Sequence, residues 1–428
     1  MISLLTTAFI LAHFYPALLA ATRITFFVFV ALVALDVWLL YRVRTGISGT
    51  RVCPDRLSNG DENPISIELN NHYTFPLTAE VIDELPLQFQ ARDNAHHRIL
   101  KAGMREVIAF TLRPTERGLY RFGHVNVLAC TPLHLVQRRY QVATAREVPV
   151  YPSFLQMRGF ELMAASNRLH EVGVKRIRRI GQASAFERIK EYVVGDDPRT
   201  VNWRATARRG ELMVNQYQDE RAQPVYCLLD AGRVMELPFD GMTLLDHSIN
   251  ASLVISNVAL KKQDKVGLIA FSSEIHNVLP ASAGVRQLGQ MMDRLYGLQT
   301  NFLATDYERL YSTVRRQARQ RSLMLLFTNF ASMAALKRQL PYLKALARNH
   351  LLVVIFFENT ELTALASIPP ADTAAVYTRT IAAQFMLQKQ QIVKELQKHL
   401  IQSVLTRPEN LSVDTLNKYL ELKARGLF

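Results

Sequence analysis

The chain has 428 residues but only three cysteines, and no Cys-x-x-Cys pair or cysteine–histidine cluster occurs in it. This scarcity argues against a disulfide framework and a structural zinc site, and it fits a reducing compartment. Acidic residues are also few, because 37 Asp and Glu stand against 51 Lys and Arg and leave a formal net charge of +14. A basic excess of this size indicates contact with anionic lipid, nucleic acid or an acidic protein partner.

Several catalytic and ligand-binding motifs are absent as well. The sequence contains no Walker-type phosphate-binding loop, no His-Glu-x-x-His pair and no Gly-x-Ser-x-Gly nucleophile turn. Their absence argues against the nucleotide, zinc and serine-based chemistries that these motifs support. Basic patches interleaved with stacking aromatic residues are missing too. We therefore expect a protein that is not an enzyme, needs no cofactor and binds no nucleic acid.

The N-terminus is strongly apolar. Residues 2–21 and 24–41 form two almost wholly apolar runs, and each approaches the roughly 20 residues that cross about 30 Å of hydrocarbon as a helix. Only Thr22 and Arg23 separate the runs, so two spanning helices would have to lie antiparallel. The pattern predicts a transmembrane hairpin in residues 1–45. One retained helix after processing and a buried core segment are the alternatives.

Basic residues beside the second apolar run predict its orientation. Arg42, Arg44 and Arg51 follow the run, whereas only Arg23 lies in the preceding turn. Cytoplasmic flanks of membrane helices carry the excess of Lys and Arg, which places everything after Tyr41 in the cytoplasm. We therefore expect a multi-pass protein of the inner (cytoplasmic) membrane whose soluble domains face the cytoplasm.

Two soluble domains of different character follow. Residues 49–152 alternate between apolar and polar positions in short runs separated by turns, which is typical of an all-β sandwich. In residues 222–380, apolar strands such as 351–357 alternate with amphipathic helices, which predicts an α/β domain with a mainly parallel sheet. Residues 381–428 predict a C-terminal helical tail, either packed on this domain or free to bind a membrane surface or a partner.

The segment between these domains, residues 153–221, is rich in charges of both signs. Asp197 can cap a helix that starts at Pro198, carries Trp203 and ends at Gly210. Acids and arginines share the segment, which indicates an ion-pair cluster that joins the two domains or, alternatively, a surface that docks a partner or an anion. The residues that we select as this interaction segment are Glu191, Tyr192, Gly195, Asp196, Asp197, Arg199, Trp203, Arg204 and Arg208.

Through these residues the sequence resembles a bacterial family known as domain of unknown function 58. Residues 84–86, 117–123 and 418–423 agree with the same family, so the resemblance spans nearly the whole chain. It implies an α/β domain similar to von Willebrand factor type A, a MoxR-type AAA+ ATPase as partner, and a chaperone-like role in the assembly or maturation of client proteins. One departure is the Cys-Thr-Pro-Leu-His turn at residues 130–134, where relatives usually have Asp-Pro-Leu-Gly.

The resemblance also raises the question of a metal. Type A domains that bind Mg²⁺ use an Asp-x-Ser-x-Ser loop, a Thr and a further Asp, because this cation prefers oxygen ligands in an octahedral array. The corresponding positions here are Asp230, Thr300 or Thr305, and Asn329. Both serines are absent and the second carboxylate is an amide, so we expect a degenerate site without metal. The alternative is a metal-dependent binder or hydrolase that acts at the strand ends around Asp230.

Overall fold

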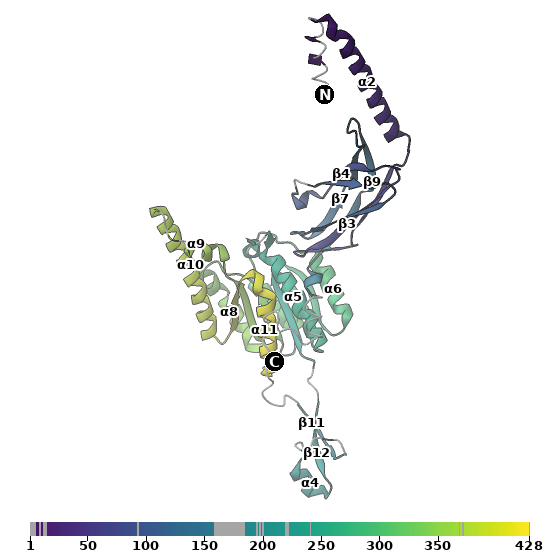
Figure 1. Ribbon diagram of the computed structural model, residues 1–428. Helices are drawn as coiled ribbons and strands as arrows, with labels where there is room; N and C mark the ends of the chain where they lie inside the picture. Colours follow the sequence, from purple (N-terminus) through teal and green to yellow (C-terminus); the bar gives the residue numbers. More distant parts are fainter. Residues whose placement is uncertain are drawn as a thin grey trace. The chain divides into compact units, whose positions relative to one another are not determined.

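The chain divides into two compact units, Met1–Tyr151 and Pro152–Phe428. The first holds a long helix and three β-sheets, and the second holds a six-stranded sheet, its helices and two short hairpins (Figure 1). The computed structural model describes residues 6–7, 10–11, 15–91, 94–157, 185–193, 196, 198, 201–218, 222–239, 241–367, 369 and 372–427.

The long helix of the first unit is α2 (Pro16–Tyr41), which runs without a break through Thr22 and Arg23. The turn predicted at these two residues is therefore wrong, and so are the predicted helix boundaries around it. Pro16 lies in the first turn of α2, where a residue without an N–H leaves no intrahelical bond unmade, so it starts a helix. Most of the predicted helix ahead of this point lies outside the described residues. The segment Leu19–Tyr41 is long and apolar enough to cross a membrane.

Near its C-terminal end, α2 is joined to the β-sheets by the carboxylate of Asp36. This side chain is fully buried and accepts a hydrogen bond from the Thr131 hydroxyl. It also accepts from the backbone N–H groups of Leu135 and Val136, at 3.1 and 2.8 Å. A charge withdrawn from water needs such donors, so the turn that carries them fixes this end of the helix.

The turn that supplies these donors follows β8 (Val125–Cys130). Its backbone closes through a hydrogen bond of 3.1 Å from the His134 N–H to the Thr131 carbonyl, and His134 has a φ of +53°. This left-handed conformation favours glycine, which is the residue that the resemblance assigns to relatives at this position. The histidine thus adopts a backbone conformation that suits a glycine.

The last carbonyl groups of α2 are capped by side chains from the strands. A helix leaves its final four C=O groups without partners inside the helix. The Leu40 carbonyl accepts from the Tyr73 hydroxyl and from the Arg138 guanidinium. Arg138 also donates to the carbonyls of Val43 and Arg44, at 2.8 and 3.0 Å. Helix and strands are therefore parts of one packed unit.

The strands of the first unit form sheets of three, three and four strands. Buried positions alternate along them, so each sheet turns one face inward. Side chains from two of the sheets share one core, and a second core lies under the third sheet. In sheet order the strands are β1 (Ile47–Val52), β3 (Asn63–Asn71) and β6 (Arg105–Leu112); β2 (Leu57–Ser58), β10 (Arg146–Tyr151) and β7 (Gly118–Phe122); and β5 (Ala95–Leu100), β4 (Leu77–Asp83), β8 and β9 (Gln137–Ala143).

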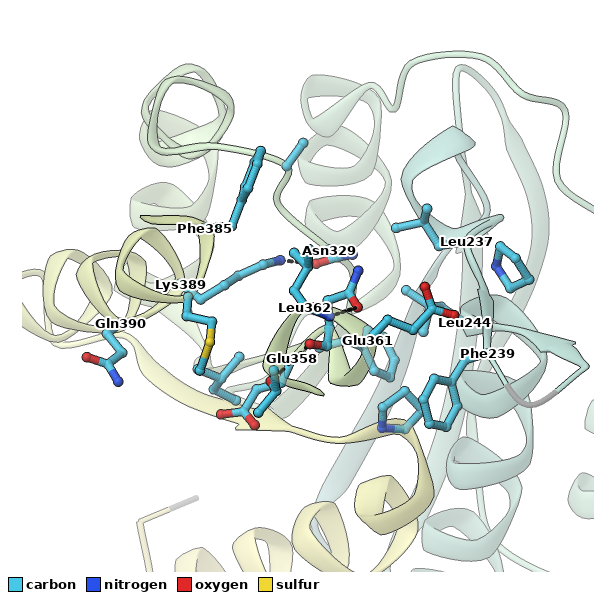
Figure 2. A pocket seen from close by; sticks show the side chains of 18 residues that line it. Leu237, Phe239, Leu244, Asn329, Glu358, Glu361, Leu362, Phe385, Lys389 and Gln390 are labelled. Carbon is cyan, nitrogen blue, oxygen red and sulfur yellow. Dashed lines mark hydrogen bonds between the residues drawn. The ribbon is translucent and has the colours of Figure 1, made fainter. Parts of the chain in front are cut away.

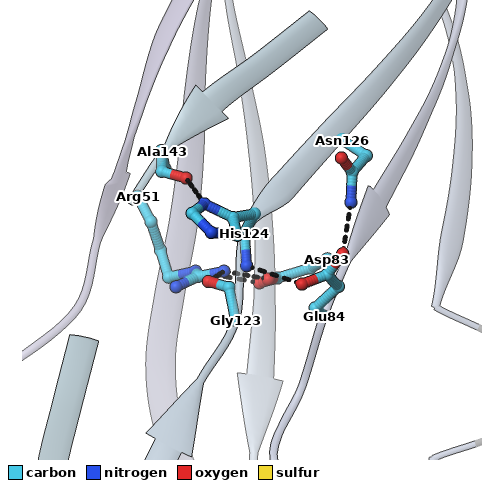
Figure 3. Close-up of polar contacts among 7 residues, drawn as sticks. All are labelled: Arg51, Asp83, Glu84, Gly123, His124, Asn126 and Ala143. Atoms are coloured by element: carbon cyan, nitrogen blue, oxygen red, sulfur yellow. Dashed lines mark hydrogen bonds and ion pairs between the residues drawn. The ribbon is translucent and has the colours of Figure 1, made fainter. Parts of the chain in front are cut away.

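Two motifs of the family resemblance meet in this unit (Figure 3). Glu84 accepts from Asn126 Nδ2 at 2.7 Å, and a Cβ placed on Gly123 would lie 2.4 Å from the Glu84 carboxylate. Beside them Arg51 and Asp83 form a buried ion pair, and Arg51 also donates to the Gly123 carbonyl at 3.1 Å. Both motifs therefore have a structural role here, because only glycine leaves room for the glutamate.

The second unit is built on a six-stranded sheet in the order β17-β16-β13-β18-β19-β20. The edge strand β17 is antiparallel to its neighbour, and the other five strands are parallel. The central strands are buried along almost their whole length, as is usual for strands covered on both faces. The strands are β13 (Pro224–Asp230), β16 (Lys265–Phe271), β17 (Ile275–Ser282), β18 (Leu323–Phe327), β19 (Leu351–Phe357) and β20 (Gln402–Thr406).

Helices cover both faces of this sheet (Figure 1). Tyr226 and Leu228 of β13 share a core with α7, α8 and α10, whereas Cys227, which points the other way, lies against Ser252 and Ser256 of α5. The helices α6 and α11 pack beside α5. The helices are α5 (Leu244–Lys261), α6 (Val285–Tyr296), α7 (Tyr307–Gln317), α8 (Met333–Asn349), α9 (Thr360–Ser367), α10 (Thr373–Lys398) and α11 (Leu411–Ala424).

The C-terminal residues are part of this domain, which agrees with the prediction of a tail packed on it, but they include a strand that the sequence did not predict. The strand β20 extends the sheet in parallel beside β19. The helix α11 is held by Tyr419 and Lys423, which donate to the Asp264 carboxylate at 2.6 and 2.8 Å. A half-exposed edge strand of five residues is too short to show a period in the sequence, which explains the error.

We expect Asp36→Ala to destabilise the first unit by about 1–3 kcal/mol, because buried donors lose their acceptor. Denaturant unfolding of the full chain in detergent, followed by Trp38 fluorescence in a Trp203→Phe background, measures this change. Asp55→Ala is the control, since Asp55 forms an exposed pair with Arg146 at 2.6 Å and such pairs contribute little. Equal stability of the Asp36→Ala and parent proteins would show that this carboxylate does not hold the helix.

Candidate functional site

The carboxyl edge of the six-stranded sheet carries a buried polar cluster around Asp230, the last residue of β13. Asp230 Oδ1 accepts from the Thr305 hydroxyl at 2.6 Å and from the Gly232 N–H at 2.8 Å. Its Oδ2 accepts from the Thr328 hydroxyl at 2.7 Å, and Thr328 lies 2.8 Å from the Tyr307 hydroxyl. Open α/β sheets bind their ligands at this edge, which makes the cluster the first candidate site.

The cluster fills the space that a metal-binding loop would need. Gly232 stands where an Asp-x-Ser-x-Ser loop has its first serine. A Cβ at this position would lie 2.1 Å from Thr305 Oγ1 and 3.0 Å from Asp230 Oδ1, so a serine does not fit unless the loop moves. The part of the chain that the structure describes contains no group of three or more His, Cys, Asp or Glu able to hold a metal ion. The arrangement is that of a closed hydrogen-bond network.

The pKa values of Asp230 and Tyr307 indicate which group donates and which accepts in this network. Burial raises the pKa of Asp230 above its ordinary value, and the hydrogen bonds from Thr305 and Thr328 act against that rise. Burial and the neighbouring Asp230 raise the pKa of Tyr307 well above its ordinary value, so the tyrosine stays protonated. The proton order that satisfies all three groups runs from Tyr307 to Thr328 and from Thr328 to Asp230.

The degenerate metal-site positions predicted from the sequence do not all lie together in the structure. Thr305 contacts Asp230, whereas the Thr300 hydroxyl accepts from the Phe302 N–H at 3.3 Å and lies outside the cluster. Asn329 turns to another partner, because its Oδ1 accepts from Lys389 Nζ at 2.5 Å. Two of the three degenerate metal-site positions thus have separate roles.

Lys389 reaches the sheet edge from α10 and lines a cavity of about 330 Å³ (Figure 2). Burial lowers the pKa of this lysine to about 8. This residue was not predicted, because a lysine in an amphipathic helix resembles a solvated position. The signal that could have found it is its spacing from Phe385 and Ile392, which places the lysine on the apolar face of α10.

The interaction segment forms a β-hairpin that encloses a short helix. The strand β11 (Ala185–Glu191) pairs antiparallel with β12 (Met213–Gln218), and α4 (Trp203–Arg209) lies between them in the sequence. These two strands form a sheet of their own. The segment predicted as a linker is therefore an ordered supersecondary unit over its described residues.

The limits of α4 differ from the predicted helix at one end only. Its first cap is Asn202, whose side chain accepts from the Ala205 N–H at 3.0 Å, so the predicted start at Pro198 is wrong. The reason is the isolated bridge between Val201 and Val214, which pairs the residue before the cap with β12. The helix ends at Gly210, which has a φ of +81° and closes it as expected.

Two ion pairs lie inside this hairpin. Lys190 Nζ is 2.8 Å from Asp196 Oδ1, and Arg209 Nη1 is 3.8 Å from Glu191 Oε1. The Lys190 ammonium and the Val193 N–H lower the pKa of Asp196. The pair of Lys190 and Asp196 is partly buried and helps to hold the loop.

The remaining selected residues are exposed, half-buried or outside the described residues. The side chain of Trp203 is 72% exposed, and Arg204 and Arg208 on the same helix are exposed. Tyr192 is half-buried, and its N–H donates to the Leu212 carbonyl at 2.8 Å. The three that fall outside the described residues are Gly195, Asp197 and Arg199.

Comparison with known proteins identifies relatives of the hairpin and the α/β domain. The sequence model of the family described as "Protein of unknown function DUF58" matches residues 188–391, from β11 into α10. Over 266 residues the chain is 26% identical to "Uncharacterized protein YeaD" of Bacillus subtilis (strain 168), which covers 60% of this chain and 63% of the relative. The resemblance to this family is thereby confirmed over residues 188–391, and the type A-like fold and the MoxR-type partner that it implies stay predictions.

Solved structures are similar over parts of the chain. BatB of Bacteroides thetaiotaomicron, described as a conserved hypothetical protein, is 12% identical with a TM-score of 0.30 and covers 48% of this chain and 100% of that one. The CARDB domain of a Pyrococcus furiosus protein is 16% identical with a TM-score of 0.19 and covers 24% of this chain and 91% of that one. Neither similarity bears on the chemistry of the site.

We expect Asp230→Asn to fold, because an amide can accept from Thr305 and donate to Thr328. The folded pKa of Asp230 is raised, so its contribution to wild-type stability falls as the pH rises above the unfolded value of about 3.9. The neutral amide has no such loss, so the variant should gain stability relative to wild type between about pH 4 and about pH 7.

Urea unfolding of both proteins across this range measures the difference. Asp293→Asn, which changes an exposed carboxylate on α6, is the matched control and should show no such gain. A difference between Asp230→Asn and wild type that does not change with pH would contradict a buried carboxyl with a raised pKa.

Proposed function

We propose that this chain, which belongs to the DUF58 family, is a membrane-anchored interaction protein without catalytic activity. In this proposal it works with a MoxR-type AAA+ ATPase in the chaperone-like assembly or maturation of client proteins. The family resemblance suggests the partner, and the exposed hairpin supplies the contact surface. The observation that carries the proposal is the exposure of Trp203 on a hairpin that has its own internal ion pairs.

The surface around Trp203 has the chemistry of a protein contact. Tryptophan and arginine are the side chains most enriched among residues that dominate binding energy at interfaces. Arg204 and Arg208 are four residues apart on α4 and therefore lie on one side of it, next to the exposed indole. Two cations beside an apolar ring suit a partner surface that combines acidic groups with an apolar pocket.

The α/β domain is, in this proposal, similar to a type A domain that binds without metal. Its mainly parallel sheet and the carboxylate at the end of β13 support that view. The competing proposal is a metal-dependent binder or hydrolase around Asp230. A metal at this site would require the loop at Gly232 to open, because the hydroxyls of Thr305 and Thr328 already donate hydrogen bonds to both oxygens of the carboxylate.

The anchor in this proposal is α2, with the domains on the cytoplasmic side. Arg51 was counted among the flanking charges, but it is buried in the ion pair with Asp83. The positive bias therefore depends on Arg42 and Arg44 against Arg23.

We expect a C-terminal tag to be resistant to protease added outside intact bacterial spheroplasts and to be cleaved after lysis, because the two arginines hold that side in the cytoplasm. Replacing Arg42 and Arg44 with glutamine should reduce this protection, and replacing Arg56 and Arg113 should leave it unchanged. Cleavage of the wild-type tag in intact spheroplasts would reverse the proposed orientation.

We expect Trp203→Ala to weaken recovery of the ATPase when the tagged chain is purified from its own membranes. Loss of a dominant interface side chain is worth about 2 kcal/mol or more, which is roughly a 30-fold change in affinity. Arg204→Ala should weaken recovery to a smaller degree, because it removes one charge and leaves the indole.

Matched controls are Tyr377→Ala on α10, an aromatic side chain that is 69% exposed, and Arg316→Ala on α7. Both should recover the ATPase as wild type does. Undiminished recovery with Trp203→Ala would sink the assignment of the contact to this hairpin, and absence of the ATPase from the wild-type sample would sink the partnership.

A further inference from the structure

A cavity of about 330 Å³ opens at the carboxyl ends of β18, β19 and β20, and the interaction surface described above does not use it (Figure 2). One wall is apolar and comes from the segment that leads into α5, with Leu237, Phe239 and Leu244. The facing wall comes from α10, with Phe385 and Lys389. Small-ligand sites are concave and mostly apolar, begin at about 300 Å³, and carry a few polar groups that orient the ligand.

The charged group that α10 brings to this cavity is Lys389. Its Nζ donates to Asn329 Oδ1 at 2.5 Å and to the Phe330 carbonyl at 2.9 Å, and it lies 5.8 Å from the centre of the Phe356 ring. An ammonium group has three donors, so the third is left for a ligand. Among the described residues, no carboxylate lies within ion-pair distance of this amine. A largely buried cation with only neutral acceptors is a natural place for an anion.

Two carboxylates in the cavity wall limit which anion can enter. Glu358, at the end of β19, lies 3.9 Å from Arg407 Nε and is partly exposed. Glu361, in the first turn of α9, is exposed to solvent. Both repel a negative charge that lies beside them, so an anion is favoured only where Lys389 holds its charge, which disfavours phosphates and dicarboxylates. The remaining lining accepts an apolar body.

We propose that this cavity binds a ligand that carries a single carboxylate on an apolar body. The carboxylate accepts from the free N–H of Lys389, and the body packs between Phe385 and the side chains of Leu237 and Phe239. Such chemistry belongs both to a small free carboxylic acid and to the carboxy-terminus of a peptide chain with apolar last residues. The site is independent of the hairpin surface and of the ATPase partnership.

The test is calorimetric titration of the full chain in lipid nanodiscs, with empty nanodiscs as the blank. The probes are 4-phenylbutyrate and the peptide acetyl-Ala-Ala-Leu-Phe with a free carboxy-terminus, each compared with its primary amide. At least one acid should bind at least about tenfold more tightly than its amide, a difference of about 1.4 kcal/mol. The acid that binds more tightly identifies the source of the carboxylate.

Variants distinguish the contribution of the Lys389 charge to binding from that of the apolar lining. Lys389→Met keeps the length of the side chain, so acid and amide should then bind alike, whereas Lys389→Arg should keep the preference for the acid. Lys398→Met, on the same helix and 69% exposed, is the matched control and should behave as wild type. Phe385→Ala should weaken acid and amide together, and near-UV circular dichroism verifies that each variant is folded.

Three results would overturn the proposal: no binding of either acid to wild type, equal binding of acids and amides to wild type, or an unchanged acid preference in folded Lys389→Met.

Discussion

A carboxylate that is removed from water must be hydrogen-bonded from within the protein, and the hold of the β-sheets on α2 depends on this constraint at Asp36. The Thr131 hydroxyl and two backbone N–H groups satisfy it, while Tyr73 and Arg138 cap the carbonyls at the end of the same helix. Because both kinds of group are held by the strands, α2 cannot pivot freely at its end. The same constraint holds at Asp230, whose carboxylate accepts hydrogen bonds from two threonine hydroxyls at the carboxyl edge of the six-stranded sheet.

The sequence predicted best where one physical signal dominated. The strand β19 was predicted with its observed limits, because its seven apolar residues between a helix and a polar turn are too few for a helix. The turn at Thr22 and Arg23 was wrong, because two polar residues do not end a helix that apolar residues continue on both sides. The short edge strand β20 was missed, since its half-exposed residues carry little pattern.

The candidate site also contains residues that the sequence predicts and residues that it does not. Asp230 was identified from the sequence, because it directly follows an apolar strand and strand ends meet at one edge of a parallel sheet. The choice between Thr300 and Thr305 could not be made, since loop geometry decides it. Lys389 was missed, because its spacing marks only the apolar face of a helix and its partner Asn329 lies 60 residues away in the sequence.

The turn at residues 130–134 must be chemically compatible with the buried carboxylate of Asp36. Relatives, by the resemblance, carry an aspartate where this chain has Thr131, and here the partner of Thr131 is itself an aspartate. Two buried carboxylates in contact repel each other unless they share a proton. An aspartate at position 131 would therefore have to share a proton with Asp36, and a helix and a turn that each brought an acid to this contact would be mismatched.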